Sequence, residues 1–166
     1  MYNVSLRITN DVNDAEDVLQ EAFISAFSNI SKFKGDSSFG AWIKRIVINK
    51  AINHINKNKI DTLDVDELGI DIEEESFDDQ SKYSVESILH AIEKLPEGYR
   101  VVFSLYLMEG YDHNEISEIL GISESTSKSQ YNRSKKKIKE ILKQEVQYGQ
   151  SKRSSGGFRK IQQTAV

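Results

Sequence analysis

The 166-residue chain contains no cysteine and a single proline. Without cysteine it can form neither a disulfide framework nor a thiolate metal site, and it has no cysteine nucleophile. Its three histidines, His54, His90 and His113, lack the spacing of a zinc-ligand pair. No signal peptide is expected, and the apolar runs are far shorter than the roughly 20 residues that cross a bilayer. We therefore expect an all-α cytoplasmic protein with no membrane insertion, no metal and no cofactor.

Acidic residues are concentrated in one segment. The net charge of −4 hides a stretch, residues 61–84, that holds ten acidic residues and one basic residue with little apolar periodicity. This composition is typical of a solvated linker. We predict two small helical domains, at residues 1–60 and 85–148, joined by this acidic linker and followed by a flexible basic tail at residues 149–166.

The first long amphipathic pattern begins after Asn13, which can cap a helix with Glu16 in the capping-box position. Apolar residues at steps of three and four predict one buried stripe: Ala15, Val18, Leu19, Ala22, Phe23, Ala26, Phe27 and Ile30. The other side carries Asp14, Asp17, Gln20 and Glu21. That side is either a solvated face whose acids suit the helix dipole or a docking surface for a basic partner.

A turn-forming stretch at residues 32–38 precedes a second long helix, predicted from Phe39 to about Asn58. Polar residues form one stripe along it: Arg45, Asn49, Asn53 and Lys57. Their amide and guanidinium groups can hydrogen-bond base edges or phosphates. The aromatic residues beside the stripe, Phe33, Phe39 and Trp42, offer surfaces on which an unstacked base can sit. A tryptophan here is more often part of the core, so both roles stay open for Trp42.

The C-terminal part begins with two predicted helices. Ser84 can cap the first. The sequence Pro96-Glu97-Gly98 separates it from the second, which we expect from Tyr99 to Glu109 with Gly110 as its natural C-cap. The residues expected to face inward on the second helix are Val102, Phe103, Tyr106 and Leu107.

A helix-turn-helix follows. Asp112 and Glu115 stand in a capping-box arrangement for a short helix that Gly121 ends, and Ser123 caps a final helix to about Lys143. This spacing is typical of the motif, which has a substantial false-positive rate when found alone.

The final helix has two sides. The predicted inward side comprises Ser127, Tyr131, Ser134, Ile138, Ile141 and Leu142. The outward side comprises Ser125, Lys128, Ser129, Asn132 and Lys136, with Arg133 and Lys135 at its margins. Hydroxyls and an amide near the helix start can reach base edges, and the later cations can meet phosphates. A solvated basic face is the alternative.

Four motifs together resemble the extracytoplasmic-function (ECF) sigma factors of bacterial RNA polymerase, in the family's order from about Leu6 to Leu142. They are Asp14-Ala-Glu-Asp-Val-Leu-Gln-Glu-Ala-Phe23, Phe39-Gly-Ala-Trp-Ile-Lys-Arg-Ile46 with Asn49, Leu95-Pro-Glu-Gly-Tyr-Arg100, and Gly110-Tyr-Asp-His-Asn-Glu-Ile-Ser-Glu-Ile-Leu-Gly-Ile-Ser123. The resemblance implies a non-enzymatic initiation factor built from sigma region 2, a helical bundle, and sigma region 4, a helix-turn-helix domain. The implied partners are core RNA polymerase, through its beta-prime clamp helices and beta flap, and promoter DNA. An anti-sigma factor is a further candidate partner.

The resemblance also implies a role for each surface. Asp14, Asp17, Gln20 and Glu21 would dock on the basic clamp helices. Phe33, Phe39, Trp42, Arg45, Asn49 and Asn53 would melt the minus-ten element and capture a flipped base. Ser125, Thr126, Lys128, Ser129, Asn132, Arg133 and Lys136 would read the minus-thirty-five element. The acidic linker would suit a basic channel near the RNA path.

The chain departs from the family pattern in three places. It begins where the family has roughly a further helix, so we expect Met1 to Thr9 to be the remainder of one. Ser127 replaces the usual valine, which we expect to weaken packing behind the recognition helix. Gln130 replaces a common arginine, which removes a phosphate contact.

Two other functions fit parts of the sequence. A stand-alone helix-turn-helix regulator explains the C-terminal part but not the acidic face. A defective paralogue would bind polymerase without initiating transcription. An enzyme fits least, because no histidine is placed to act as a base and no glycine-rich phosphate loop is present.

Overall fold

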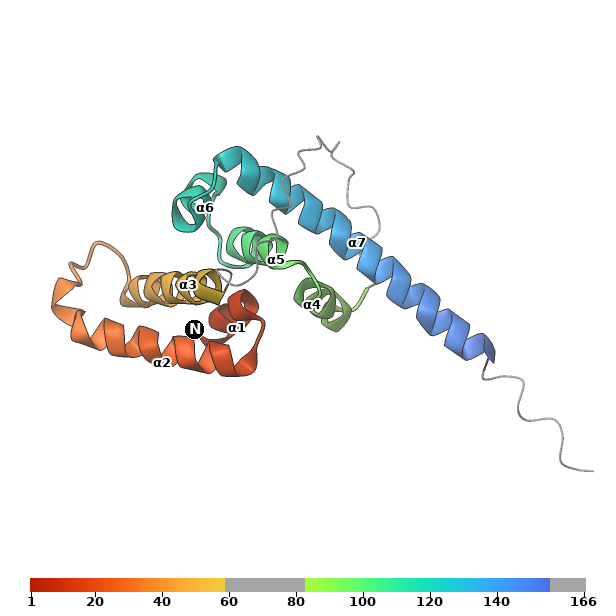
Figure 1. Ribbon diagram of the computed structural model, residues 1–166, viewed down its shortest axis with the longest axis horizontal. Coiled ribbons are helices and arrows are strands. Elements are labelled where there is room, and N and C mark those ends of the chain that lie inside the picture. Colours follow the sequence, from red (N-terminus) through yellow and green to blue (C-terminus); the bar gives the residue numbers. More distant parts are fainter. Residues whose placement is uncertain (59–82, 156–166) are drawn as a thin grey trace, which may run out of the picture.

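The computed structural model describes the backbone of residues 1–58 and 83–155, which are helical apart from short turns (Figure 1). The all-α prediction is therefore confirmed. Most of the predicted acidic linker and residues 156–166 lie outside the described part of the chain.

Three helices form the N-terminal part. Helix α1 spans Tyr2–Thr9, α2 spans Val12–Ser28, and α3 spans Phe39–Asn58, with a short 3-10 turn, η1, at Ile30–Lys32. The predicted bounds of α3 are confirmed. Helices α2 and α3 lie side by side, and α1 contacts both (Figure 1).

The start of α2 differs from the prediction. Asp11, rather than Asn13, is the N-cap, and its carboxylate accepts hydrogen bonds from the backbone amides of Asn13 and Asp14 at 2.8 and 3.0 Å. Asp11 has the extended backbone conformation of an N-cap residue. The first turn therefore starts two residues earlier than the apolar pattern indicates.

The predicted apolar stripe of α2 is only partly buried. Four small residues are buried, Ala15, Val18, Ala22 and Ala26. Phe27 and Ile30 are 65% and 52% exposed, so their predicted burial is wrong. Alanines that lie directly against α3 bring the two helices close, and the larger side chains farther along the chain fall outside the contact.

The C-terminal part contains α4 (Val85–Glu93), α5 (Glu97–Phe103), a π-helical turn η4 (Ser104–Met108), α6 (His113–Leu120) and α7 (Glu124–Ser155). Helix α5 begins at Glu97 after Pro96, two residues before the predicted start. Helix α7 continues past the predicted end at Lys143 and extends beyond the other helices (Figure 1).

The π-helical turn changes which residues face the core. The amide of Glu109 donates to the carbonyl of Ser104 at 3.1 Å, five residues back, which adds one residue to the turn. Within this turn Leu105 is fully buried and Leu107 is 58% exposed. The prediction that Leu107 faces inward is wrong, because the buried side of this segment is formed by Val101, Val102 and Leu105.

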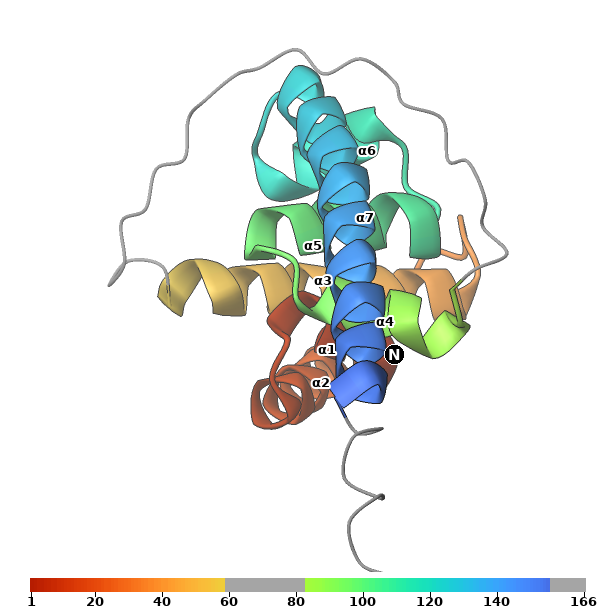
Figure 2. The same cartoon turned by 90° about the vertical axis from the view of Figure 1, so that its right-hand side faces the viewer.

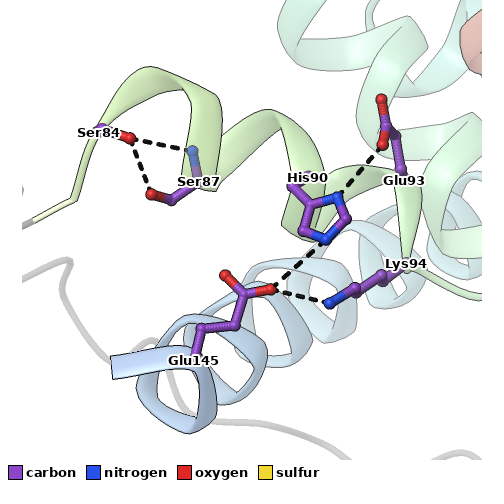
Figure 3. Close-up of polar contacts among 6 residues, drawn as sticks. All are labelled: Ser84, Ser87, His90, Glu93, Lys94 and Glu145. Atoms are coloured by element: carbon purple, nitrogen blue, oxygen red, sulfur yellow. Dashed lines mark hydrogen bonds and ion pairs between the residues drawn. The ribbon is translucent and has the colours of Figure 1, made fainter. Parts of the chain in front are cut away.

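The helix-turn-helix caps are as predicted. The capping box of Asp112 and Glu115 is complete, and Gly121 has the left-handed conformation with φ of 67°. The Ser123 hydroxyl accepts a hydrogen bond from the amide of Thr126 at 3.0 Å. Ser84 likewise caps α4 through the amide of Ser87 (Figure 3).

The two parts pack against each other through α1 and α5, which lies between α1 and α7 (Figures 1 and 2). One cluster of buried apolar side chains spans the contact: Val4, Ile8, Val18, Ile48, Ala51, Ile52 and Ile55 from the N-terminal part, and Val101, Val102, Leu105 and Ile116 from the C-terminal part. Because the cluster is shared, each part helps to cover the apolar surface of the other.

Candidate nucleic-acid and protein interfaces

The predicted docking residues of α2 lie outside its buried apolar stripe. Asp17, Gln20 and Glu21 are exposed, and Asp14 is half-buried. Two polar contacts connect this side to α3: Glu21 pairs with Lys50 at 3.4 Å, and a carboxylate oxygen of Asp14 lies 3.2 Å from Nε2 of His54. The structure therefore brings the four predicted docking residues onto one side of one helix.

Two large apolar residues continue this side of α2. Ile24 is 67% exposed, and Phe27, 65% exposed, is also in contact with the ring of Phe23 at a centroid distance of 6.3 Å. In helical spacing Ile24 follows Asp17 by seven residues and Gln20 by four, which places them on one side. Large exposed apolar side chains grouped on one face indicate an interaction surface. The sequence gave one indication of this surface, because Ile24 is a large apolar residue that does not belong to the predicted apolar stripe of the helix.

Three aromatic residues form a cluster where the turn before α3 meets the helix. The ring of Phe33 lies 5.5 Å from that of Phe39 and 5.4 Å from that of Trp42, and Phe39 and Trp42 are stacked at 5.7 Å. Phe39 is 43% exposed, whereas Phe33 and Trp42 are half-buried. Trp42 also packs against the cluster of Ala22, Ala26, Ile43 and Val47. It therefore contributes to the core and to this surface.

Polar side chains extend from the aromatic cluster along α3. Arg45, Asn49 and Asn53 are exposed on one stripe of the helix. Ser38 fixes the start of α3, because its hydroxyl accepts a hydrogen bond from the amide of Ala41 at 3.2 Å. The six predicted residues of this surface thus lie on one turn and one helix, with flat rings at one end and hydrogen-bonding groups along the side.

The start of α7 presents short polar side chains. The Ser123 hydroxyl lies 2.8 Å from the hydroxyls of both Ser125 and Thr126, and the Ser129 hydroxyl donates to the carbonyl of Thr126 at 2.9 Å. Ser125 is exposed, and Thr126 and Ser129 are half-buried. These bonds hold the hydroxyls in place at the end of the helix that a recognition helix presents to DNA.

Basic residues follow along α7. Lys128 and Lys136 are exposed, and Asn132 and Arg133 are half-buried. Lys128 lies 2.7 Å from Glu124, one turn away. Gln130 instead points to the C-terminal core, where its side-chain amide lies against Gly98 of α5. The seven predicted residues share the outer side of α7, whereas the side chain of Gln130 packs against α5.

Ser127, the residue expected to weaken packing, has a hydrogen-bonding partner. It is fully buried, and its hydroxyl lies 2.9 Å from Nδ1 of His113 at the start of α6. The imidazole ring also stacks on Tyr106 at 4.4 Å. Burial lowers the pKa of His113, and the nearby charge of Lys128 lowers it further. The pair joins α6 to α7, so the hydroxyl strengthens rather than weakens this contact.

Within residues 1–58 and 83–155 no group of three or more potential ligands lies together where it could hold a metal ion. None of the helices in this part of the chain is long and apolar enough to span a membrane.

Two family models match the chain. The model for Sigma-70 region 2 matches residues 1–60, and the model for Sigma-70, region 4, matches residues 85–138. Together they cover both parts of the structure that carry the surfaces described above.

Curated relatives match over most of their length. The chain is 32% identical over 155 residues to the ECF RNA polymerase sigma factor SigW of Bacillus subtilis, which covers 86% of this chain and 83% of that protein. It is 31% identical over 149 residues to the RNA polymerase sigma-H factor of Pseudomonas aeruginosa, with 82% and 77% covered. It is 31% identical over 137 residues to the ECF RNA polymerase sigma-E factor of Escherichia coli, with 75% and 72% covered.

Two solved structures share the fold at 20% sequence identity. One is the sigma factor RpoE from Bartonella quintana in complex with the anti-sigma factor NepR, with a TM-score of 0.58 over 86% of this chain and 89% of the other. The second is CnrH in complex with the cytosolic domain of CnrY, with a TM-score of 0.51 over 86% and 79%.

Proposed function

The chain belongs to the sigma-70 family as an ECF-type RNA polymerase sigma factor, and on that premise we propose which of its surfaces carry the function. It binds core RNA polymerase and directs promoter recognition, DNA melting and transcription initiation. We propose that it does so by binding alone, without catalysing a reaction, and in the cytoplasm, where bacterial RNA polymerase acts.

The docking face for core polymerase is the outer side of α2. The proposal rests on the combination of exposed acids, led by Asp17 and Glu21, with exposed Ile24 and Phe27. The acids attract a basic partner surface and set its orientation, whereas the apolar side chains supply contact area that is buried on binding. An acidic face without apolar residues would give a weaker and strongly salt-dependent contact.

The melting surface is the aromatic cluster together with the polar stripe of α3. Phe33, Phe39 and Trp42 offer ring faces, and a base stacked on such a ring gains roughly 1–3 kcal/mol. Asn49 and Asn53 can hydrogen-bond the edge of an unpaired base, and Arg45 can meet a phosphate. This set suits single-stranded DNA, because ring faces are accessible to a base only after it leaves the duplex.

The upstream reading surface is the outer side of α7. Ser125, Thr126 and Ser129 lie at the start of the helix, and Lys128, Arg133 and Lys136 lie beside and after them. A helix that enters the major groove presents its first residues to base edges and its flanks to the backbone. We assign base contacts to the hydroxyls and Asn132, and phosphate contacts to the cations.

One structural neighbour was solved in complex with the anti-sigma factor NepR, and the other in complex with the cytosolic domain of CnrY. An anti-sigma factor is accordingly a candidate partner of this protein. Its most suitable target is the exposed face of α2, since covering Ile24 and Phe27 would block core polymerase.

The observation that carries the proposal is the continuous face formed by Asp17, Gln20, Glu21, Ile24 and Phe27 on α2. The test is run-off transcription with purified protein and core polymerase on promoter DNA. The double variant Ile24→Ser with Phe27→Ser should weaken core binding at least tenfold, because exposed anchor residues at an interface each contribute more than about 1 kcal/mol. Val12→Ser, a change at a 53% exposed position at the first residue of α2, is the matched control and should bind normally.

A stand-alone helix-turn-helix regulator is the competing function. It predicts that the purified protein binds duplex promoter DNA with full affinity in the absence of polymerase and that the α2 double variant behaves as the wild type. Normal core binding by that double variant would refute the docking face proposed here.

A further inference from the structure

Two sets of buried polar side chains connect helices that are distant in the chain. The first set joins the two parts. Arg100 of α5, at 6% exposure, donates to the carbonyls of Arg7 and Ile8 at 3.1 and 3.4 Å and so caps the end of α1. Glu109 pairs with Arg7 through one oxygen and lies 2.9 Å from Lys44 of α3 through the other. This set contains none of the residues that we assign to DNA.

The second set lies inside the helix-turn-helix. The hydroxyl of Ser127, which is fully buried in the first turn of α7, lies 2.9 Å from Nδ1 of His113, the first residue of α6. The imidazole stacks on the ring of Tyr106 in η4 at 4.4 Å, with 13° between the planes. The Tyr106 ring in turn lies 4.5 Å from that of Tyr131, one turn after Ser127 on α7. Two successive turns of α7 are therefore attached to the elements behind it.

The residues that we assign to base contacts share this stretch of α7. Ser125 and Thr126 directly precede Ser127, and Ser129 follows it by two residues. Their side chains are short, so they cannot follow a displaced helix as the long side chain of a lysine can. An O–H···O hydrogen bond spans only about 2.5–3.0 Å, so a displacement of roughly 1 Å breaks it. Base reading by these hydroxyls therefore depends on where α6 and η4 hold α7.

A polar pair fixes this position more narrowly than an apolar contact would. A displacement of α7 would separate Ser127 from His113 and leave two polar groups without partners in a poorly hydrated place, which costs free energy. Apolar side chains that slide past one another stay in contact and lose less. The hydrogen bond therefore favours one arrangement of the two helices over nearby alternatives.

We propose that His113, acting through Ser127, is a positioning residue that sets how sharply this protein discriminates between upstream DNA sequences. The inference rests on the proposed function, in which the outer side of α7 reads the upstream element, and it adds a residue that lies behind that side. Loss of the pair should weaken the base contacts. Phosphate contacts made by flexible side chains such as Lys128 and Lys136 should persist, so that sequence-independent affinity is retained.

Two buried serines of α7 provide a variant and its matched control. Ser127→Ala removes one hydroxyl and with it the hydrogen bond to α6. Ser134→Ala also removes one fully buried hydroxyl, but that hydroxyl donates to the carbonyl of Tyr131 at 2.7 Å within α7 itself. His113→Phe is the partner variant, because it keeps a ring that can stack on Tyr106 and removes the nitrogen that contacts Ser127.

The test uses the full chain bound to core polymerase and a promoter library that is randomised across the upstream element. Sequencing of the bound DNA gives the ratio of preferred to mismatched sequences. Ser127→Ala and His113→Phe should each lower this ratio about tenfold, the size of effect expected for one mismatched base pair. The double variant should also lose about tenfold, since the two residues act as a unit. Binding of non-specific duplex should stay the same, and Ser134→Ala should behave as the wild type.

Three results would overturn the proposal. Wild-type discrimination by either single variant would show that the pair does not position α7. An equal loss in Ser134→Ala would show that any buried hydroxyl of α7 matters, through folding alone. A loss of about a hundredfold in the double variant would show that the two residues act independently. If His113→Phe loses helical content, as measured by circular dichroism, the comparison of Ser127→Ala with Ser134→Ala decides.

A second measurement reads the position of α7 without DNA. The chain has no cysteine, so spin labels can be placed at two exposed positions, Glu118→Cys in α6 and Lys143→Cys in α7. Ser127→Ala should broaden the distribution of distances between the labels, and Ser134→Ala should not. An unchanged distribution in Ser127→Ala would overturn the positioning role. If the wild-type complex selects no upstream sequence, the proposed function fails, and the label distances still decide whether the pair positions α7.

Discussion

One pair of polar side chains connects the two helices of the helix-turn-helix. Ser127 and His113 form a buried hydrogen bond between α6 and α7, and the imidazole lies on the ring of Tyr106. From the sequence, Ser127 reads as a packing defect, because its partner lies 14 residues away on another helix. The helix pattern correctly placed Ser127 on the buried side, but it carried no information about the group opposite.

We expect the stability of the protein to fall as pH drops below about 6.5, in part through His113. Burial lowers the pKa of His113 below its ordinary value of 6.5, so the unfolded chain takes up a proton that the folded chain binds more weakly. The contribution is fully present above that pH and is lost as the pH falls from the unfolded-state pKa through the lower pKa of the folded state. Urea unfolding followed by circular dichroism at neutral and mildly acidic pH measures it.

The control for this prediction is the double variant His113→Leu with Ser127→Val, which replaces the polar pair by an apolar one. It should lose less stability on acidification than the wild type, and because His54 and His90 remain in both proteins, the difference isolates the pair. An equal loss in both proteins would show that His113 is not responsible.

The aromatic and amide groups of α3 give a second prediction at this scale. Trp42→Ala with Asn49→Ala should slow or prevent formation of the open promoter complex by tenfold or more, since stacking of one base is worth roughly 1–3 kcal/mol. Core binding should be unaffected, because α2 carries the docking face. Permanganate reactivity of unpaired thymines measures melting, and normal melting by a variant with wild-type helical content would refute the role of this surface.

At the scale of elements, the π-helical turn η4 sets the register of everything that follows α5. Its five residues include buried Leu105 and exposed Leu107, and Glu109, which follows it, contacts α1 and α3. The sequence predicts the helix, its proline start and its glycine end, but periodicity alone assumes one hydrogen-bond pattern throughout. The extra residue in the turn is set by tertiary packing, and for that reason pattern analysis placed Leu107 in the core.

Two leucines of η4, one buried and one exposed, allow a matched pair of substitutions. Leu105→Ala should lower the free energy of unfolding by about 2–5 kcal/mol, since it leaves a cavity in the shared cluster. Leu107→Ala, at an exposed position of the same turn, should change it by less than about 0.5 kcal/mol. Urea titrations of both variants measure the difference. Equal losses, or a larger loss for Leu107→Ala, would mean that Leu107 packs in the core rather than at the surface.

For α7, the assigned phosphate contacts predict a change in salt dependence. Lys128→Ala and Arg133→Ala should each weaken binding of the polymerase complex to the upstream element and reduce the slope of log affinity against log salt by about one. Lys94→Ala, on α4, is the control, since that side chain pairs with Glu145 away from the reading surface (Figure 3). A slope that stays the same in the α7 variants would remove these residues from the interface.

On the scale of the whole molecule, one apolar cluster includes residues of both parts. The sequence predicted the helices and the helix-turn-helix from local patterns, and the resemblance to ECF sigma factors supplied the helical bundle and completed the residues of the three candidate surfaces. It gave no indication of the contact between the parts. Arg100 and Glu109 read as ordinary charges at helix positions, and their partners in the N-terminal part lie more than 60 residues away in the chain.

The shared cluster predicts that a change in α1 is felt in α5. Ile8→Ala removes a side chain that is 1% exposed, and it should lower the free energy of unfolding by about 2–4 kcal/mol. Amide hydrogen exchange should become faster in α5 as well as in α2 and α3. Val12→Ala, at an exposed position, should leave exchange unchanged. Faster exchange confined to α2 and α3 would show that the two parts unfold independently.

The capping of α1 by Arg100 also bears on how freely such proteins can exchange parts during evolution or in the laboratory. A hybrid made by joining residues 1–60 of this chain to the upstream-reading part of a relative would place Arg7 and Lys44 opposite a foreign surface. Unless that surface supplies an equivalent of Arg100 and Glu109, the hybrid would leave the end of α1 without its cap and two cations without their carboxylate. Promoter specificity can then be transplanted only together with this small set of charges.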